Sequence, residues 1–291
     1  MSSSRAIVCA MAFALACLAA MPPASAAAGD GGILYLPSAA SLAHCLTSCG
    51  DVNISYPFGI GGGCFRQGFE LTCNNATKPP KLFVGNSTTQ ITDMFGYSGL
   101  LVPMFFNISG TNNTYNISWD APTKGIFISR GNDFYVVDCD FDVDLFDHVR
   151  NPIGSCVSRC HGKALPNQGP CNGVGCCSIS IPNDIAGFQA TIVWADNMAA
   201  QSDPLHTGIM AFMSDGDYSN NATDLFLSWT NASNIVGAVL DVSIMDQPSC
   251  KSAKMNNASY ACAADGYCRN ESYGGYTCHC NSYNNYYTSN A

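Results

Sequence analysis

Hydrophobic residues along the chain come in short runs rather than at helical spacing. The runs are rich in Val, Ile, Phe, Tyr and Thr, and Gly, Asn, Asp or Pro bounds them, which is typical of β-strands between turns. Beyond the N-terminal apolar run, no segment repeats its apolar positions with a period of about 3.6 residues. The pattern predicts an all-β protein with strands in residues 68–73, 100–109, 115–119, 125–130, 134–146, 176–182, 188–195, 208–214 and 234–245.

One of these runs alternates strictly between polar and apolar side chains. The aspartates on one face are Asp138, Asp140, Asp142 and Asp144, and the residues on the other are Cys139, Phe141, Val143 and Leu145. This is the pattern of a half-buried strand with a solvated acidic face. The spacing also resembles the start of a calcium loop, but Val143 replaces the required glycine and Val149 the closing glutamate. We therefore favour a strand face over a metal site.

The first residues have the pattern of a secretory signal peptide. Arg5 precedes an apolar run over residues 6–21, which ends at two prolines and is followed by a small-residue cleavage site at 24–26. The run is shorter than the roughly 20 residues that span a bilayer. We predict a signal peptide over residues 1–26, a mature chain without a membrane span, and a polar C-terminus unlike the hydrophobic tail of a glycolipid anchor.

The charge balance is acidic, with 12 Lys and Arg against 21 Asp and Glu and a net charge of −9. Nucleic acid is excluded as a partner, because phosphate binding needs clustered cations. Only 11% of residues are charged, so we expect Asn-linked glycans to supply solubility. Ten Asn-x-Ser/Thr sequons are present, at Asn53, Asn75, Asn86, Asn107, Asn112, Asn116, Asn221, Asn231, Asn257 and Asn270.

Cysteine content points to an oxidising compartment. Of 17 cysteines, Cys9 and Cys17 lie in the signal peptide and 15 remain. The histidines show no zinc-binding spacing, so disulfides are expected and no metal. Ten cysteines lie between Cys45 and Cys177 and five follow from Cys250. The expected disulfide cysteines are Cys45, Cys49, Cys64, Cys73, Cys139, Cys156, Cys160, Cys171, Cys176, Cys177, Cys250, Cys262, Cys268 and Cys278. Connectivity within the first ten stays open.

The spacing of the first cysteines carries a family resemblance. Cys45 and Cys49 are followed by the block Tyr56-Pro-Phe-Gly-Ile and by Cys64, then by the string GFELTC; a second C-x3-C pair and a C-x4-C-C-x3-I-P string come later. Together they resemble the ectodomain of plant wall-associated receptor-like kinases, over residues 41–280, with the galacturonan-binding domain first. Physically, the Tyr-Pro-Phe-Gly-Ile block favours a structural turn over a ligand contact.

The last five cysteines, from Cys250 to Cys280, end in the string Gly-Gly-Tyr-Thr-Cys-His-Cys and resemble an EGF-like module. The resemblance implies the pairs Cys250–Cys268 and Cys262–Cys278 and leaves Cys280 as a free thiol. The acidic pair that marks calcium-binding modules is missing before Cys250. The expected organisation is a signal peptide at 1–26, a cysteine-rich galacturonan-binding-like domain at 41–182, a β-rich region at 183–249 and a partial EGF-like module at 250–291.

The resemblance implies extracellular binding of cell-wall pectin, the polygalacturonic acid polymer, by a secreted protein of the wall or apoplast. Kinase and hydrolase signatures are missing from the sequence, so we expect no enzyme and no cofactor, with calcium only as a bridge to pectin. Charged and aromatic residues of the first domain are the natural sugar contacts, with cations meeting carboxylates and rings stacking on sugars. The candidates are Arg66, Lys78, Lys81, Tyr56 and Phe65.

Two other interpretations stay open. The chain could be a protein-interaction ectodomain, a decoy or co-receptor that joins full-length receptor kinases or another extracellular protein, and it would then reach the membrane through that partner. A free Cys280 would favour a covalent partner. Alternatively, the sequence is part of a full receptor kinase. The salt dependence of binding distinguishes pectin binding from the protein-interaction interpretation. Contacts between cations and pectate weaken as salt increases, whereas a hydrophobic interface does not.

Overall fold

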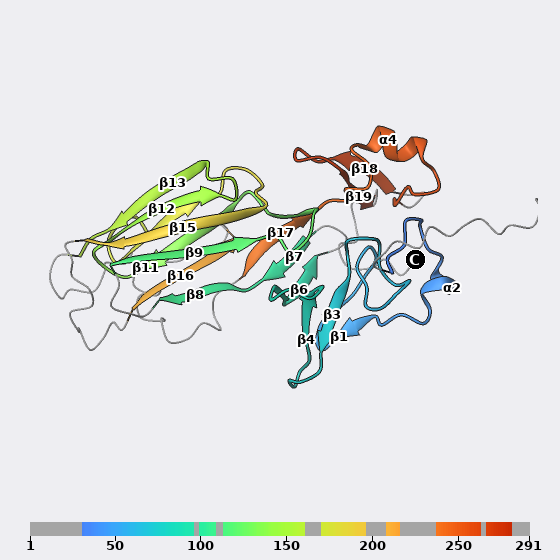
Figure 1. The fold of residues 1–291 in the computed structure, drawn as a ribbon, viewed down its shortest axis with the longest axis horizontal. Coiled ribbons are helices and arrows are strands. Elements are labelled where there is room, and N and C mark those ends of the chain that lie inside the picture. Colours follow the sequence, from blue (N-terminus) through green and yellow to red (C-terminus); the bar gives the residue numbers. More distant parts are fainter. Residues whose placement is uncertain are drawn as a thin grey trace, which may run out of the picture.

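The protein is an elongated, strand-rich molecule with a β-sandwich at one end and its first cysteine cluster and C-terminal hairpin at the other (Figure 1). This computed structural model describes residues 31–95, 99–108, 113–160, 170–195, 208–215, 237–262 and 266–280. The predicted all-β, disulfide-rich class is confirmed. The predicted signal peptide lies outside these ranges. Among the described residues, the helices are too short to cross a membrane.

Two four-stranded antiparallel sheets form the sandwich, with strand orders β13-β12-β15-β9 and β14-β11-β16-β8. The first sheet comprises β9 (Thr114–Asp120), β12 (Phe141–Asp147), β13 (Pro152–Ser158) and β15 (Gly187–Trp194), and the second comprises β8 (Met104–Ile108), β11 (Asn132–Val137), β14 (Cys176–Ser180) and β16 (Ile209–Asp215). Phe188 of β15 meets Phe134 of β11 between the sheets, with ring centroids 5.4 Å apart. Burial of such alternate apolar side chains is the main stabilising interaction at this end.

A third sheet extends the second one toward the middle of the molecule. Its order is β10-β17-β7-β6, from β6 (Asp93–Phe95), β7 (Gly99–Val102), β10 (Ile126–Ile128) and β17 (Ala238–Val242). The chain passes from β10 into β11 through a bend that the buried Asn132 holds. Its amide nitrogen donates to the carbonyls of Ser129 at 2.6 Å and Val239 at 2.9 Å, and its oxygen accepts the Val239 N–H at 2.9 Å.

The cysteine-rich end begins with short strands that two disulfides hold together. Its elements are α2 (Ala39–Leu42), β1 (Ser48–Cys49), β2 (Val52–Asn53), β3 (Leu71–Asn74), β4 (Lys81–Val84) and β5 (Gln90–Ile91). The bonds Cys45–Cys64 and Cys49–Cys73 join these segments. Phe58 of the Tyr-Pro-Phe-Gly-Ile block is buried and packs edge-to-face on Phe69, with centroids 5.3 Å apart. The block therefore has the structural role that its residues favoured.

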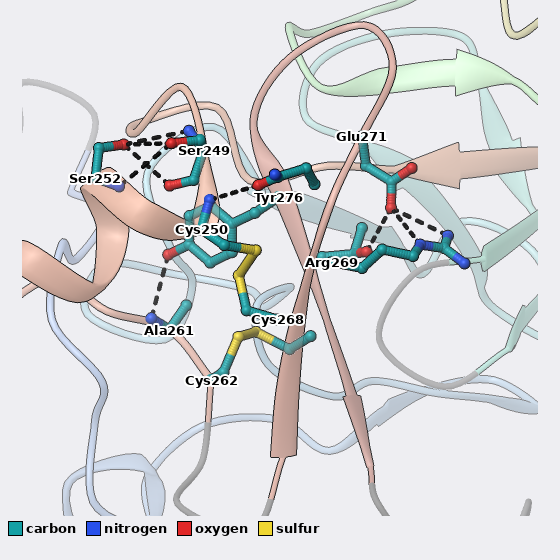
Figure 2. The surroundings of a disulfide bond; sticks show 12 residues. Ser249, Cys250, Ser252, Ala261, Cys262, Cys268, Arg269, Glu271 and Tyr276 are labelled. Carbon is teal, nitrogen blue, oxygen red and sulfur yellow. Dashed lines mark hydrogen bonds and ion pairs between the residues drawn. A yellow bond between two sulfur atoms is a disulfide. The ribbon is translucent and has the colours of Figure 1, made fainter.

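The tail is a helix, α4 (Cys250–Met255), beside the hairpin of β18 (Gly266–Asn270) and β19 (Tyr276–Cys280). Both disulfides implied by the EGF-like resemblance, Cys250–Cys268 and Cys262–Cys278, are confirmed. Figure 2 shows the Ser249–Ser252 capping box, which begins α4 and which the hydrophobic pattern missed. The side chain of Cys280 lies outside what the structure describes.

The tail is attached to the rest of the chain by a short backbone bridge. The N–H of Ile244 donates to the carbonyl of Tyr276 at 2.9 Å, and the N–H of Tyr276 donates back at 3.1 Å. Gly275 permits this approach, because a Cβ there would lie 2.4 Å from the Ile244 carbonyl oxygen. The hydroxyl of the buried Tyr276 accepts the N–H of Ala261 at 3.2 Å.

Two predicted runs, residues 100–109 and 134–146, differ from their prediction, because each forms two strands rather than one. The first contains β7 and β8, which belong to different sheets, and the second contains β11 and β12. β11 belongs to one sheet and β12 to the other, so the chain turns between them at Asp138–Asp140, where Asp138 and Asp140 have positive φ angles. Asp138 is only 5% exposed. It therefore does not belong to the predicted solvated face, and the alternation of buried and more exposed residues holds from Phe141 to Leu145.

The first ten disulfide cysteines pair among themselves, as their even number suggested. Besides the two bonds of the cysteine-rich end, the pairs are Cys139–Cys160, Cys156–Cys177 and Cys171–Cys176. The Cys156–Cys177 bond joins β13 to β14, the edge strands of the two sandwich sheets. It supplements the hydrophobic contact between the sheets.

Candidate functional site

The five residues predicted to contact sugar fall into two groups in the structure. Lys78 and Lys81 are exposed on the hairpin that β3 and β4 form. Phe65 and Arg66 are fully buried, and Tyr56 is half-buried beside them. The hydroxyl of Tyr56 accepts a hydrogen bond from Arg66 at 3.1 Å, so the second group belongs to the interior of the cysteine-rich end.

Arg66 is the centre of a buried polar network. Its guanidinium Nη2 donates to the Asp246 carboxylate at 2.5 Å and to the Ser259 carbonyl at 2.6 Å. Burial alone lowers the pKa of Arg66, but Tyr56 and Asp246 outweigh it and raise that pKa above its usual value. Burial also raises the pKa of the Tyr56 hydroxyl, against the opposing effect of Arg66. The guanidinium therefore stays charged and the phenol stays neutral.

This network changes the assignment of two candidates. Arg66 and Phe65 are each 0% exposed, so neither presents a surface to a polysaccharide. The prediction that they contact sugar is corrected: Phe65 is a core residue, and the charge of Arg66 is neutralised by Asp246. Asp246 could not be found from the sequence, because it lies 180 residues from Arg66 and no local pattern connects the two.

Lys78 and Lys81 are placed where a long polymer can reach them. Lys81 begins β4 opposite Asn74, and Lys78 lies in the connecting turn. The turn is held by Asn74, whose side-chain oxygen accepts the N–H of Ala76 at 2.9 Å. Asn75, a predicted glycosylation site, lies in the same turn. Both ammonium groups therefore share one hairpin with a sequon.

The sequons within the described residues all lie on the surface. These exposed asparagines are Asn53, Asn75, Asn86, Asn107, Asn116, Asn257 and Asn270. Asn112, Asn221 and Asn231 fall outside the described ranges. Exposure is required for an attached glycan, so the placement suits the predicted glycosylation.

The acidic run of β12 is engaged in local contacts. Asp142 pairs with Arg159 at 2.5 Å on the exposed face. Asp147 accepts the N–H groups of Val149 at 2.9 Å and Asn151 at 2.8 Å. In the described part of the chain, the side chains close enough to share a metal are His44, Cys45 and Cys64. The two sulfurs are joined to each other, so they are not thiolate ligands.

A cavity of about 320 Å³ lies at the junction between the cysteine-rich end and the middle of the chain. Three segments line it: residues 66–69, residues 123–124 and residues 244–246. The hydroxyl of Thr123 donates to the Gly68 carbonyl at 3.2 Å and so joins two of these segments. Lys124 is exposed at its edge. Lys124 could not be found from the sequence, because its neighbours around the cavity are distant in the chain.

Comparison with known proteins relates the chain to receptors of the plant cell wall. The family described as wall-associated receptor kinase galacturonan-binding matches residues 45–99. Wall-associated receptor kinase 5 of Arabidopsis thaliana is 29% identical over 81% of this chain and 32% of that protein. Wall-associated receptor kinase 3 of the same plant is 30% identical over 81% of this chain and 34% of that protein. The chain thus spans about a third of the length of these relatives.

Proposed function

Because the chain is similar to wall-associated receptor kinases over 81% of its length, we propose that it is a non-catalytic extracellular module that binds cell-wall galacturonan. The observation that carries the proposal is the galacturonan-binding family match at residues 45–99. The matched segment contains the two disulfides that join the short strands of this end. It also contains the exposed hairpin with Lys78 and Lys81.

Charge is the physical obstacle to this function, because a chain of net charge −9 repels a polyanion. With Arg66 neutralised by Asp246, the exposed cations of the matched segment are Lys78 and Lys81, on one hairpin. Two nearby ammonium groups suit a polymer that carries a carboxylate on every sugar, because each can form a charge-assisted hydrogen bond. Exposed carboxylates of the same segment, such as Asp51 and Glu70, offer calcium a way to bridge protein and pectate.

The test is binding of the secreted, glycosylated protein to de-esterified polygalacturonate across a salt series, with and without calcium. Salt should weaken the binding, because the contacts are exposed ion pairs. The double variant Lys78→Gln/Lys81→Gln should bind about three- to tenfold more weakly, since exposed pairs contribute ~0.2–1 kcal/mol each. Lys251→Gln/Lys254→Gln, two exposed lysines of α4, is the matched control and should bind like the wild type.

Two outcomes contradict the proposal. Failure of the wild-type protein to bind polygalacturonate under every condition would reject galacturonan as the ligand. Equal losses of polygalacturonate affinity in the hairpin variant and the α4 control would show that binding depends on net charge rather than on a site on the hairpin.

A further inference from the structure

The two edges of the β-sandwich are built differently. At one edge the Cys156–Cys177 bond joins β13 to β14. The loop before β14 is hydrogen-bonded to the start of β14 and to the residue after β13, because the Gly173 N–H donates to the Cys176 carbonyl at 2.8 Å and the Arg159 N–H donates to the Gly173 carbonyl at 2.9 Å. β13 also begins with a proline, and a register irregularity interrupts its pairing with β12. Prolines, bulges and covering loops protect an edge strand from pairing with another chain.

The opposite edge, formed by β8 and β9, is built without these features. In the described part of the chain each strand pairs on one side only, β8 with β16 and β9 with β15, and both registers continue without a bulge. Neither strand contains Pro, Lys or Arg, and the one charged residue is Asp120 at the end of β9. An edge strand of this kind presents a row of backbone N–H and C=O groups with which a second chain can pair.

Both strands of this β8–β9 edge carry a glycosylation sequon. Among the residues that the structure describes, the sequon asparagines in the two sandwich sheets are Asn107 of β8 and Asn116 of β9, each followed by Ile-Ser. Side chains alternate along a strand, so the isoleucine faces the core where the asparagine faces outward. Ile108 is buried and Ile117 packs against the core, whereas both asparagines are exposed.

The hydrogen bond of Asn116 is compatible with an attached glycan. Its side-chain oxygen accepts the hydroxyl of Thr191, on the neighbouring strand β15, at 2.9 Å. A glycan is attached through the amide nitrogen of asparagine, and the oxygen remains an acceptor. The bond to Thr191 therefore holds the side chain on the outer face of the sheet, beside the edge, and leaves the nitrogen for the sugar.

The partner that such an edge favours is a second copy of this chain, because every copy presents the same edge. Segments of high β-propensity with little charge and no proline are the ones that pair with identical segments. The sequences MFFNI of β8 and TYNISWD of β9 fit this description. Phe105 and Phe106 of β8 are only half-buried and add apolar surface there. A bulky glycan on each strand hinders the approach of a second strand.

We propose that Asn107 and Asn116 are glycosylated and that their glycans prevent the β8–β9 edge from pairing with the same edge of a second copy of this chain. The inference goes beyond galacturonan binding and does not depend on it. One edge of the sandwich is closed by a disulfide, a loop and a proline, and the other is closed by sugar. The remaining described sequons lie outside the two sandwich sheets and should have no such role.

The experiment measures the molar mass of the full secreted chain by size-exclusion chromatography with light scattering, over a series of protein concentrations. Free thiols are alkylated first, so that Cys280 cannot link two copies. The wild type should be monomeric, and glycopeptide mass spectrometry should find sugar on Asn107 and Asn116. Asn107→Gln/Asn116→Gln should show a molar mass about twofold higher or more, as for a dimer or larger assembly. Hydrogen exchange of the β8 and β9 amides should be slower in that assembly than in the wild type.

Three matched variants separate protection of the edge from a general effect of sugar. Asn107→Lys/Asn116→Lys lacks the same glycans but places a charge on each strand, which also blocks strand pairing, so it should stay monomeric. Asn53→Gln/Asn257→Gln removes two sequons outside the sandwich and should stay monomeric. Asn107→Gln/Ser118→Ala removes the edge sequons but keeps Asn116 and its bond to Thr191, and it should associate like the Gln variant.

Several results would overturn the inference: both asparagines without sugar in the wild type, or a Gln variant that is monomeric at every concentration. Equal association of the Lys variant or of the Asn53/Asn257 control would also overturn it, because the edge would not be what the glycans protect. If the Gln variant is not secreted, the glycans are removed enzymatically from the folded wild type and Lys variant. The wild type should then associate and the Lys variant should not; the reverse, or no association in either, would reject the inference. Polygalacturonate binding is measured separately, so the proposed function stands or fails independently.

Discussion

The two ends of this molecule are stabilised by different interactions. In the sandwich, strands of up to eight residues bury alternate apolar side chains between sheets. At the cysteine-rich end, β1 to β5 are only two to four residues long. Two disulfides lie within that end and two within the tail, and the Arg66–Asp246 pair connects that end to the segment before the tail. The sandwich has three disulfides as well, but its long strands also bury a large core. Where strands are too short to bury a large core, covalent bonds and buried charge pairs take over much of the stabilisation.

The largest effect on this contrast should come from Arg66→Met. The substitution leaves the Asp246 carboxylate and the Ser259 carbonyl without their donor, and breaking a buried pair typically costs about 3–5 kcal/mol. Hydrogen exchange measured by mass spectrometry should show that backbone amides of the cysteine-rich end and the tail lose protection, while those of the sandwich strands stay protected.

Arg159→Met is the matched control for that variant. The Arg159–Asp142 pair has the same 2.5 Å separation, but its side chains are 41% and 51% exposed. Its loss should cost less than about 1 kcal/mol. Equal losses of folding stability in Arg66→Met and Arg159→Met would show that burial does not distinguish the two ion pairs. The contrast between the two ends would then fail.

A smaller and more local test removes one disulfide from each end. Cys49–Cys73 and Cys156–Cys177 close rings of similar length, with sequence separations of 24 and 21, so the chain-entropy cost of losing either is about 3 kcal/mol. Replacing both cysteines of a pair by serine should abolish exchange protection in β3 and β4 in the first case. Without Cys156–Cys177, the sandwich strands should keep their protection from hydrogen exchange, and the protein should unfold at a lower Tm. Equal local loss of protection in both would contradict the comparison.

The smallest expected effect concerns the turn after β12. Slight burial would raise the pKa of Asp147, but hydrogen bonds from Asn151 and Val149 outweigh it and lower that pKa below 3.8. A carboxyl with a lowered folded-state pKa contributes stability above pH 3.8, and this is lost as pH falls through the folded value. Asp147→Asn should therefore lower the Tm slightly at pH 7, with the difference shrinking toward pH 2. A constant difference between pH 7 and pH 2 would contradict the assignment.

Much of the fold was predictable from local patterns. Alternation predicted the strand at Phe141–Leu145, and short apolar runs predicted the strand regions of β3, β7 to β11 and β14 to β17. The strands β1, β2, β4, β5, β6, β13, β18 and β19 lie outside the predicted runs. Family resemblance predicted the pairs Cys250–Cys268 and Cys262–Cys278. The break at Asp138 was missed because alternation does not show that a strand leaves one sheet for another. The helix α4 was missed because six residues are too few to show a period.

The candidate site was predictable only in part. Lys78 and Lys81 are exposed cations, as a contact with a polysaccharide requires. Arg66 looked equally available in the sequence, yet it is buried. Whether a cation is exposed depends on what packs over it, and Asp246 and Ser259 come from the opposite part of the chain.

The sequence by itself determined the β class, the dependence on disulfides, the signature of export and the acidic balance, because these follow from composition and from patterns a few residues long. Only the tertiary structure decided which cations reach the surface, how the first ten cysteines pair and where Lys124 joins Phe69 and Met245 around one cavity. The physical reason is that burial and proximity depend on the path of the whole chain. Contacts between residues more than a hundred positions apart leave no local pattern to read.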